Sequence, residues 1–180
     1  MAASGDLPDV DLVGVDFNPA LVAEATRLAA EESLPCRFLV ADAFALPEDA
    51  TVYLSNGVLH HIAPADLPAF FAAQDRPGTR AFLHYDIAPT RLAPFGAWVF
   101  HRARMRAPLG RHDGVASARR AHPDPLLFTA ASSAGMPTFR YGPLRHSNPF
   151  AAGMRAIIGT RDPALFQDAL GRRARGLVPA

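Results

Sequence analysis

Short apolar runs alternate with amphipathic stretches along the first half of this chain. Residues 12–15 form an apolar run that ends at Asp16, and residues 38–41 form a second run that ends at Asp42. Between the two runs, apolar side chains recur every three or four residues behind the Asn-Pro pair at 18–19, which favours a helix start. Continuous apolar runs are typical of parallel strands, and the wider spacing is typical of a helix. The pattern predicts two strands that flank a helix, with an acidic residue at the end of each strand.

The rest of the chain continues this alternation. The sequence predicts further strands at 51–55, 79–85, 138–141 and 154–160, and further helices at 65–74, 92–106, 125–133 and from 162 to about 175. Residues 107–124 are rich in Pro, Gly and Arg, and are predicted to form a long loop of the kind that serves as a lid or binding loop. Strands separated by helices predict an α/β fold with a nucleotide-binding sheet, in which ligands bind beyond the carboxyl ends of the strands.

Composition narrows the classes of function. The 180 residues are 49% apolar, which predicts one globular domain, 1–180, with a lid or substrate segment at 89–124. The net charge of +1 gives no reason to expect a nucleic-acid partner, and no apolar run reaches the ~20 residues of a membrane span. The single cysteine, Cys36, cannot form an intrachain disulfide, so we expect a cytoplasmic protein. All 18 Lys and Arg residues are arginine, which excludes chemistry that needs a lysine amine.

Three segments resemble the class I S-adenosylmethionine-dependent methyltransferases in residues, order and spacing. They are residues 13–19 (VGVDFNP), 40–43 (VADA) and 54–62 (LSNGVLHHI), and a softer similarity extends over 111–120. The resemblance implies a Rossmann-like three-layer sandwich with a mostly parallel sheet and an antiparallel last strand. It also implies S-adenosyl-L-methionine as the cofactor and a small-molecule acceptor that is methylated at oxygen or carbon.

The resemblance further implies which residues contact the cofactor. Asp16 would hold the ribose hydroxyls, and Asp42 would accept a hydrogen bond from the adenine amino group. The physical chemistry agrees, because a carboxylate accepts two hydrogen bonds from a diol and an aromatic side chain such as Phe44 packs on a flat ring. The alternatives are a charge at a helix start for Asp16 and a turn-forming side chain for Asp42. The full set of implied cofactor contacts is Asp16, Phe17, Asn18, Asp42, Ala43, Phe44, Ser55, Asn56 and Gly57.

Five further polar residues are candidates for the chemistry at the methyl acceptor. His60 and His61 are the candidate catalytic bases, because an imidazole with a pKa near neutral can take the proton of a hydroxyl nucleophile. His84, Asp86 and His112 are candidate substrate contacts. The alternatives are one packed and one solvated ring for the histidine pair, strand-end placement for His84 and Asp86, and a solvated turn for His112. We predict no metal site, because adjacent histidines point apart on an extended chain and no convincing ligand set accompanies them.

The sequence departs from the family at its N-terminal end, and this departure bears on whether the chain is an active enzyme. The family's first strand and glycine-rich turn precede the acidic residue, and residues 1–11 are too short to hold a strand, a turn and a helix. We therefore expect an N-terminally incomplete domain, which is either part of an active enzyme or a truncated, non-catalytic binding module. The rival enzyme class is a nicotinamide-dependent short-chain dehydrogenase. It relies on a Tyr-x-x-x-Lys pair, which a chain without lysine cannot supply.

Overall fold

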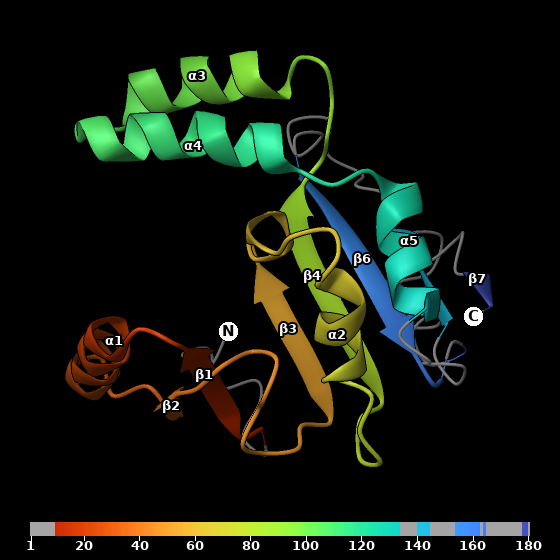
Figure 1. Cartoon of the computed structure of the whole chain (residues 1–180). Helices are drawn as coiled ribbons and strands as arrows, with labels where there is room; N and C mark the ends of the chain where they lie inside the picture. Colours follow the sequence, from red (N-terminus) through yellow and green to blue (C-terminus); the bar gives the residue numbers. More distant parts are fainter. Residues whose placement is uncertain (1–9, 134–139, 145–153, 163, 165–177, 180) are drawn as a thin grey trace. The chain divides into compact units, whose positions relative to one another are not determined.

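The computed structural model describes residues 10–133, 140–144, 154–162, 164 and 178–179. By its internal contacts the chain divides into two compact units, Met1–Glu48 and Asp49–Ala180, which we describe separately. Strands and helices alternate through both units, as the hydrophobic pattern predicts (Figure 1).

The first unit holds two strands and one helix. Strands β1 (Leu12–Asp16) and β2 (Cys36–Val40) pair in parallel over all five residues of each strand. Helix α1 (Pro19–Glu31) connects them and begins where the sequence predicts, because the Asn18 side chain accepts a hydrogen bond from the Ala20 amide at 2.9 Å. The predicted strand–helix–strand order is therefore present in this unit.

The second unit is built on a five-stranded sheet with the order β3-β4-β6-β5-β7. Its strands are β3 (Val52–Asn56), β4 (Ala81–Ile87), β5 (Arg140–Leu144), β6 (Met154–Thr160) and β7 (Val178–Pro179). Strands β3 and β4 are parallel, whereas β6 lies between β4 and β5 and is antiparallel to both. This is the α/β sheet with an antiparallel late strand that the sequence implies.

Two helices cover one face of this sheet and close the core of the second unit. Helices α2 (Leu67–Ala72) and α5 (Asp124–Ser133) contact one another over the sheet (Figure 1). Phe71 of α2 packs on Phe82 of β4, with ring centroids 5.4 Å apart. The largest fully buried apolar side chains of this core are Phe71, Phe82, Leu59, Leu67, Leu127, Ile157 and Ile158.

The predicted loop at 107–124 is wrong, because most of it is helical. Helix α3 (Ala93–Arg104) is followed by helix α4 (Pro108–Arg120), and the two helices contact each other along their lengths (Figure 1). The proline stands in the first turn of α4, where the missing N–H carries no cost. Gly114, which favoured a loop, faces the ring of His101, and a Cβ there would overlap that ring. Close packing of two helices therefore outweighs the low helix propensity of glycine.

Some predictions concern residues that the structure does not describe. The helix expected from 162 to about 175 falls mostly on 163 and 165–177, and the first two residues of the strand expected at 138–141 are likewise outside the described part. Among the residues that are described, no helix combines the length and the hydropathy needed to cross a membrane.

Candidate active site

The carboxyl ends of β1 and β2 bring two carboxylates to one edge of the first unit. Asp16 lies opposite Val40 in the parallel register, and the Ala41 amide donates to the Asp16 carbonyl at 3.0 Å. Asp42 follows directly after that contact. We call Asp16 and Asp42 the acidic edge; the sequence places them at a common sheet edge, and the structure shows this arrangement.

Each carboxylate of the acidic edge uses one oxygen for its own turn. Asp16 Oδ1 accepts a hydrogen bond from the Asn18 amide at 2.7 Å, and Asp42 Oδ1 accepts one from the Phe44 amide at 2.9 Å. Within the described residues, Oδ2 of each aspartate accepts no hydrogen bond. The turn-forming role named as the alternative for Asp42 is therefore present, and Asp16 makes a similar turn contact at the start of α1. One acceptor oxygen on each side chain stays available for a ligand.

Two aromatic side chains and two small or capping residues accompany these carboxylates. Phe17 is 82% exposed and Phe44 is 39% exposed, so each offers apolar ring surface to solvent. Asn18 uses its side-chain oxygen to cap α1, and Ala43 is half-buried between Asp42 and Phe44. An exposed aromatic ring beside a carboxylate is suited to a planar ligand that carries hydrogen-bond donors.

The end of β3 in the second unit carries the Ser55, Asn56 and Gly57 predicted from the third motif. Gly57 has a φ of 70°, a left-handed conformation that favours glycine, and its amide donates to the Tyr85 carbonyl at 2.8 Å. The Ser55 hydroxyl lies 2.7 Å from His84 Nδ1. Asn56 is exposed.

His84 lies in the core of the second unit. Its side chain is 1% exposed, its ring stacks on Phe82 at 5.1 Å, and Nε2 lies 3.0 Å from Gln74 Oε1. Because the Gln74 oxygen accepts, Nε2 carries the proton and Nδ1 accepts from the Ser55 hydroxyl. Burial lowers the pKa of His84 to about 3, so the ring is neutral at physiological pH. The predicted contact of His84 with a substrate stays a prediction.

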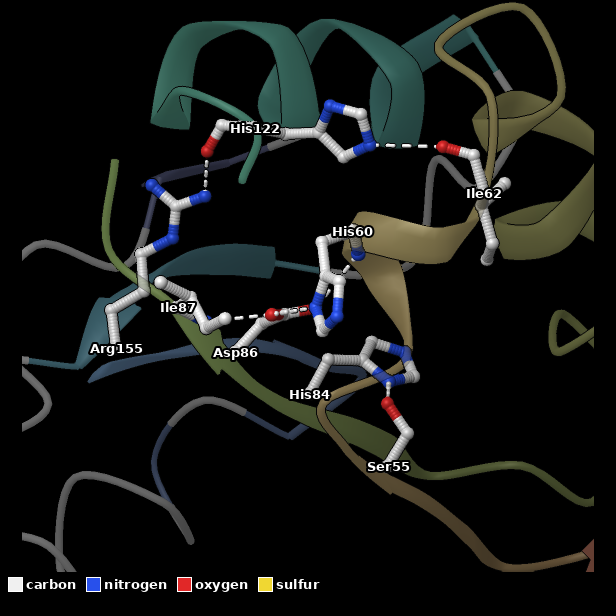
Figure 2. A network of polar contacts seen from close by, with 8 residues as sticks. All are labelled: Ser55, His60, Ile62, His84, Asp86, Ile87, His122 and Arg155. Carbon is white, nitrogen blue, oxygen red and sulfur yellow. Dashed lines mark hydrogen bonds and ion pairs between the residues drawn. The ribbon is translucent and has the colours of Figure 1, made fainter. Parts of the chain in front are cut away.

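A second histidine is held by a buried carboxylate, as Figure 2 shows. His60 stands on the short 3₁₀ helix η2 (Leu59–His61), and Asp86 lies near the end of β4. Asp86 accepts from the His60 amide at 3.0 Å, from His60 Nδ1 at 2.7 Å and from the Ile87 amide at 2.6 Å. His60 is 6% exposed and Asp86 is 3% exposed, so both residues are buried. The carboxylate thus fixes the Nδ1–H tautomer of His60.

The other ring nitrogen of His60 has no hydrogen-bond partner among the residues that the structure describes. Nε2 is buried, and with the proton on Nδ1 it carries a lone pair. Buried polar atoms are nearly always hydrogen-bonded, so each exception requires an explanation. A role as a general base would explain this atom, because its lone pair would accept a hydrogen bond once a substrate is bound.

Sequence reasoning missed the cation that accompanies Asp86. Arg155 of β6 lies opposite Asp86 in the antiparallel register, and it donates to the Asp124 carboxylate. It also donates to the His122 carbonyl, as Figure 2 shows. Burial lowers the pKa of Arg155, while Asp124 and Asp86 raise it. The available signal was an arginine inside the otherwise apolar strand that ends at Thr160, since an arginine is rarely buried without a partner.

His61 lies beside His60 but in a different environment. Its ring is exposed, and its centroid is 4.1 Å from that of His60. The expectation that the two rings point apart was wrong, because they stand on a helical turn and not on an extended chain. Burial and the neighbouring His60 lower the pKa of His61, with smaller contributions from Asp113 and Arg120 of α4. No cluster of three or more His, Cys, Asp or Glu suited to a metal occurs among the described residues.

His112 is placed on a third surface. It lies on α4 and lines a cavity between α3 and α4 together with Trp98 and Arg119. The predicted residues thus belong to three local groups, each described by itself: the acidic edge of the first unit, the His60–Asp86 pair of the second unit, and the α3–α4 cavity.

Comparison with known proteins identifies the fold. Residues 1–76 match the family described as "Methyltransferase domain". The chain has the class I methyltransferase fold. Magnesium protoporphyrin IX methyltransferase from Synechocystis, solved with bound SAH, superimposes with a TM-score of 0.57 at 17% identity, covering 89% of this chain and 68% of that one. The resemblance inferred from the three sequence segments is confirmed at the level of the fold.

Two other methyltransferase structures are similar over comparable lengths. A candidate O-methyltransferase from Nostoc punctiforme gives a TM-score of 0.59 at 15% identity and covers 88% of this chain. Human N-acetylserotonin methyltransferase, solved in complex with SAM, gives 0.56 at 18% identity and also covers 88%. This methyltransferase-like chain spans 47% and 44% of the lengths of those two proteins, about half. None of the curated proteins matches the chain.

Proposed function

We propose that this protein is an S-adenosylmethionine-dependent methyltransferase that methylates a small molecule at an oxygen or a carbon atom. The fold, the match to the methyltransferase domain and the acidic edge all support a cofactor of this kind. The observation that carries the proposal is the state of His60: Asp86 holds its Nδ1–H, and a buried Nε2 is left without a partner. An oriented base of this type suits an acceptor that must lose a proton as it gains a methyl group.

The residues of the acidic edge fit the adenosine part of the cofactor. A ribose diol and an adenine amino group are hydrogen-bond donors, and Asp16 and Asp42 each keep one carboxylate oxygen that can accept. Phe44 offers a half-covered ring that can pack on the adenine face. When bound, S-adenosylmethionine supplies an electrophilic methyl group.

His60 and Asp86 would act on the acceptor. With the cofactor bound, His60 Nε2 would take the proton that the acceptor releases as it receives the methyl group. The resulting imidazolium is stabilised by the Asp86 carboxylate, which already accepts the Nδ1–H. The exposed His61 ring, which packs against His60, would move aside to admit the acceptor.

Calorimetric titration with S-adenosylhomocysteine tests the cofactor assignment. We expect the wild-type chain to release heat on binding, and the Asp16→Asn, Asp42→Asn double variant to bind at least tenfold more weakly, because each amide keeps its turn but loses its charge. His60→Gln serves as the matched control and should bind as the wild type does. Absence of binding by the wild type would instead support the non-catalytic fragment.

The base assignment has its own readout, which needs no acceptor. Nitrogen-detected NMR of the ring should show His60 as the Nδ1–H tautomer at pH 7, and Asp86→Asn should change the populations of its two tautomers. His61 should respond to Asp86→Asn much less, because it has no hydrogen bond to that carboxylate. An Nε2–H tautomer for His60 in the wild type would remove it as the base.

A further inference from the structure

An open cavity lies between α3 and α4, and the proposed chemistry does not use it. The two helices run side by side (Figure 1), and the space between them has a volume of about 470 Å³. Trp98 and Arg102 of α3 and His112, Val115 and Arg119 of α4 line it. Small-molecule sites commonly have volumes of ~300–1,000 Å³, so the cavity is large enough for an organic ligand.

The polar side chains of this cavity carry one sign of charge. Arg102, Arg119 and His112 supply N–H donors, and none of the lining residues is acidic. Among the described residues, Arg102 and Arg119 form no ion pair, whereas Arg27 and Arg37 each pair with two carboxylates. Two guanidinium groups that face one cavity without a carboxylate are suited to an anion, which they can bind through paired N–H donors.

The remaining walls of the cavity are apolar and partly flat. Trp98 presents its ring, the guanidinium of Arg102 lies over that ring at 5.7 Å, and Val115 and Ala116 supply aliphatic surface. Trp98 is also half-exposed, so a ligand could cover its ring. An indole ring with a guanidinium above it favours a planar ligand that places an aromatic body on the ring and an anionic group near the arginines.

We propose that the α3–α4 cavity binds a planar aromatic small molecule that carries a carboxylate, and that this molecule is the methyl acceptor. The second clause rests on the proposed function; the first does not. Helix α4 links the two sites, because it carries the cavity residues His112 and Arg119 and also contacts η2, on which His60 stands. The carboxylate is then held by α3 and α4, and the nucleophilic group lies at the other end of the ligand.

Trp98 allows a direct test, because it is the only tryptophan of the chain. Nitroaromatic compounds quench tryptophan emission on contact, so para-nitrobenzoate and its neutral analogue para-nitrobenzyl alcohol report binding at this ring. We expect saturable quenching by the benzoate with an affinity about tenfold higher than that of the alcohol at low ionic strength. Added salt should weaken the benzoate and leave the alcohol unchanged. Equal affinities, or quenching that rises linearly without saturation, would overturn the proposal.

A pair of arginine variants locates the anion. Arg119→Gln should weaken the benzoate about fivefold and leave the alcohol unaffected, since it removes one lining guanidinium. Arg104→Gln is the matched control, because Arg104 lies on α3 over Phe100 and does not line the cavity. Equal losses in both variants would refute the site. These titrations contain no S-adenosylhomocysteine and are independent of the calorimetric test. If the chain binds the benzoate but not S-adenosylhomocysteine, only the proposed function is wrong. If it binds S-adenosylhomocysteine but not the benzoate, only the cavity proposal is wrong.

Discussion

Three aspartates of this chain stand at or near the end of an apolar strand, yet the structure puts them to two different uses. Asp16 and Asp42 lie at a solvent-facing sheet edge, and each spends one oxygen on a local turn. Asp86 is buried, accepts three hydrogen bonds and lies opposite Arg155. A strand-end aspartate is therefore not in itself a ligand contact. Its neighbours in the sheet decide whether its oxygens face a ligand or hold the protein together.

The surroundings of these carboxylates differ in the same way. In the first unit, the ring of Phe38 is half-buried beside Gly14 on the neighbouring strand. In the second unit, the ring of Phe82 is fully buried beside Gly159. Buried side chains in close-packed surroundings cannot shift to absorb a change, whereas half-exposed ones can. The two regions should therefore respond to matched substitutions by different amounts.

Asp86→Asn should produce the largest effect. The amide cannot balance the charge of Arg155, and its NH₂ group would face the N–H donors of His60 and Ile87 if it took the place of either oxygen. We expect a loss of about 3 kcal/mol in the free energy of unfolding, measured in urea with Trp98 emission as the probe of the second unit. Asp66→Asn, on the exposed surface before α2, is the control and should change it by less than about 0.5 kcal/mol. A near-neutral Asp86→Asn would show that the buried network is not formed.

Two glycine-to-alanine substitutions compare the regions directly. A Cβ at Gly159 would overlap the Phe82 ring, and a Cβ at Gly14 would overlap the Phe38 ring. We expect Gly159→Ala to cost about 2–3 kcal/mol, because the buried ring has no space to move into. Gly14→Ala should cost less than about 1 kcal/mol, because the half-exposed ring can rotate and the unfolded chain loses entropy. Urea midpoints followed by circular dichroism would measure both, and equal costs would contradict the difference in packing.

The burial of the His84 imidazole should make the free energy of unfolding depend on pH. Burial lowers its pKa from an ordinary 6.5 to about 3, so below pH 6.5 the unfolded chain takes up a proton that the folded chain does not. The contribution of His84 to the free energy of unfolding is therefore fully present above pH 6.5. It falls as the pH falls, and the loss reaches about 2 kcal/mol at pH 5. The difference in unfolding free energy between wild type and His84→Asn should shrink by that amount between pH 7 and pH 5. A constant difference would mean that the ring is already solvated in the folded state.

Sequence patterns predicted those parts of the molecule in which local residues decide the structure. The Asn18 cap and Pro19 set the start of α1, and the apolar runs set β1, β2 and β6 to within a residue or two. The acidic edge followed, because parallel strands end at the same side of a sheet. Helix α4 was missed because its glycines are tolerated through contact with α3, which the local sequence does not encode.

The buried network was missed for a related reason. His60 and Arg155 lie 26 and 69 residues from Asp86 along the chain, and only the register of β4 against β6 and the turn of η2 bring the three together. The predicted contact of Asp86 with a substrate stays a prediction, and in the structure its carboxylate accepts hydrogen bonds from His60. Pairing across strands depends on the whole sheet, so a strand-end pattern alone cannot distinguish the two outcomes.

The smallest effect on stability should come from the residues with the largest proposed effect on binding. In Asp16→Asn and Asp42→Asn, the amide oxygen can still accept from the Asn18 or Phe44 amide, and the lost charge faces solvent. We expect each variant to change the free energy of unfolding by less than about 0.5 kcal/mol, measured in urea alongside Asp86→Asn. Removing a side chain that contacts only a ligand changes the stability of the ligand-free protein little. A loss of unfolding free energy near that of Asp86→Asn would therefore show that these carboxylates stabilise the fold. Weaker binding of S-adenosylhomocysteine by the double variant would then no longer identify a ligand contact.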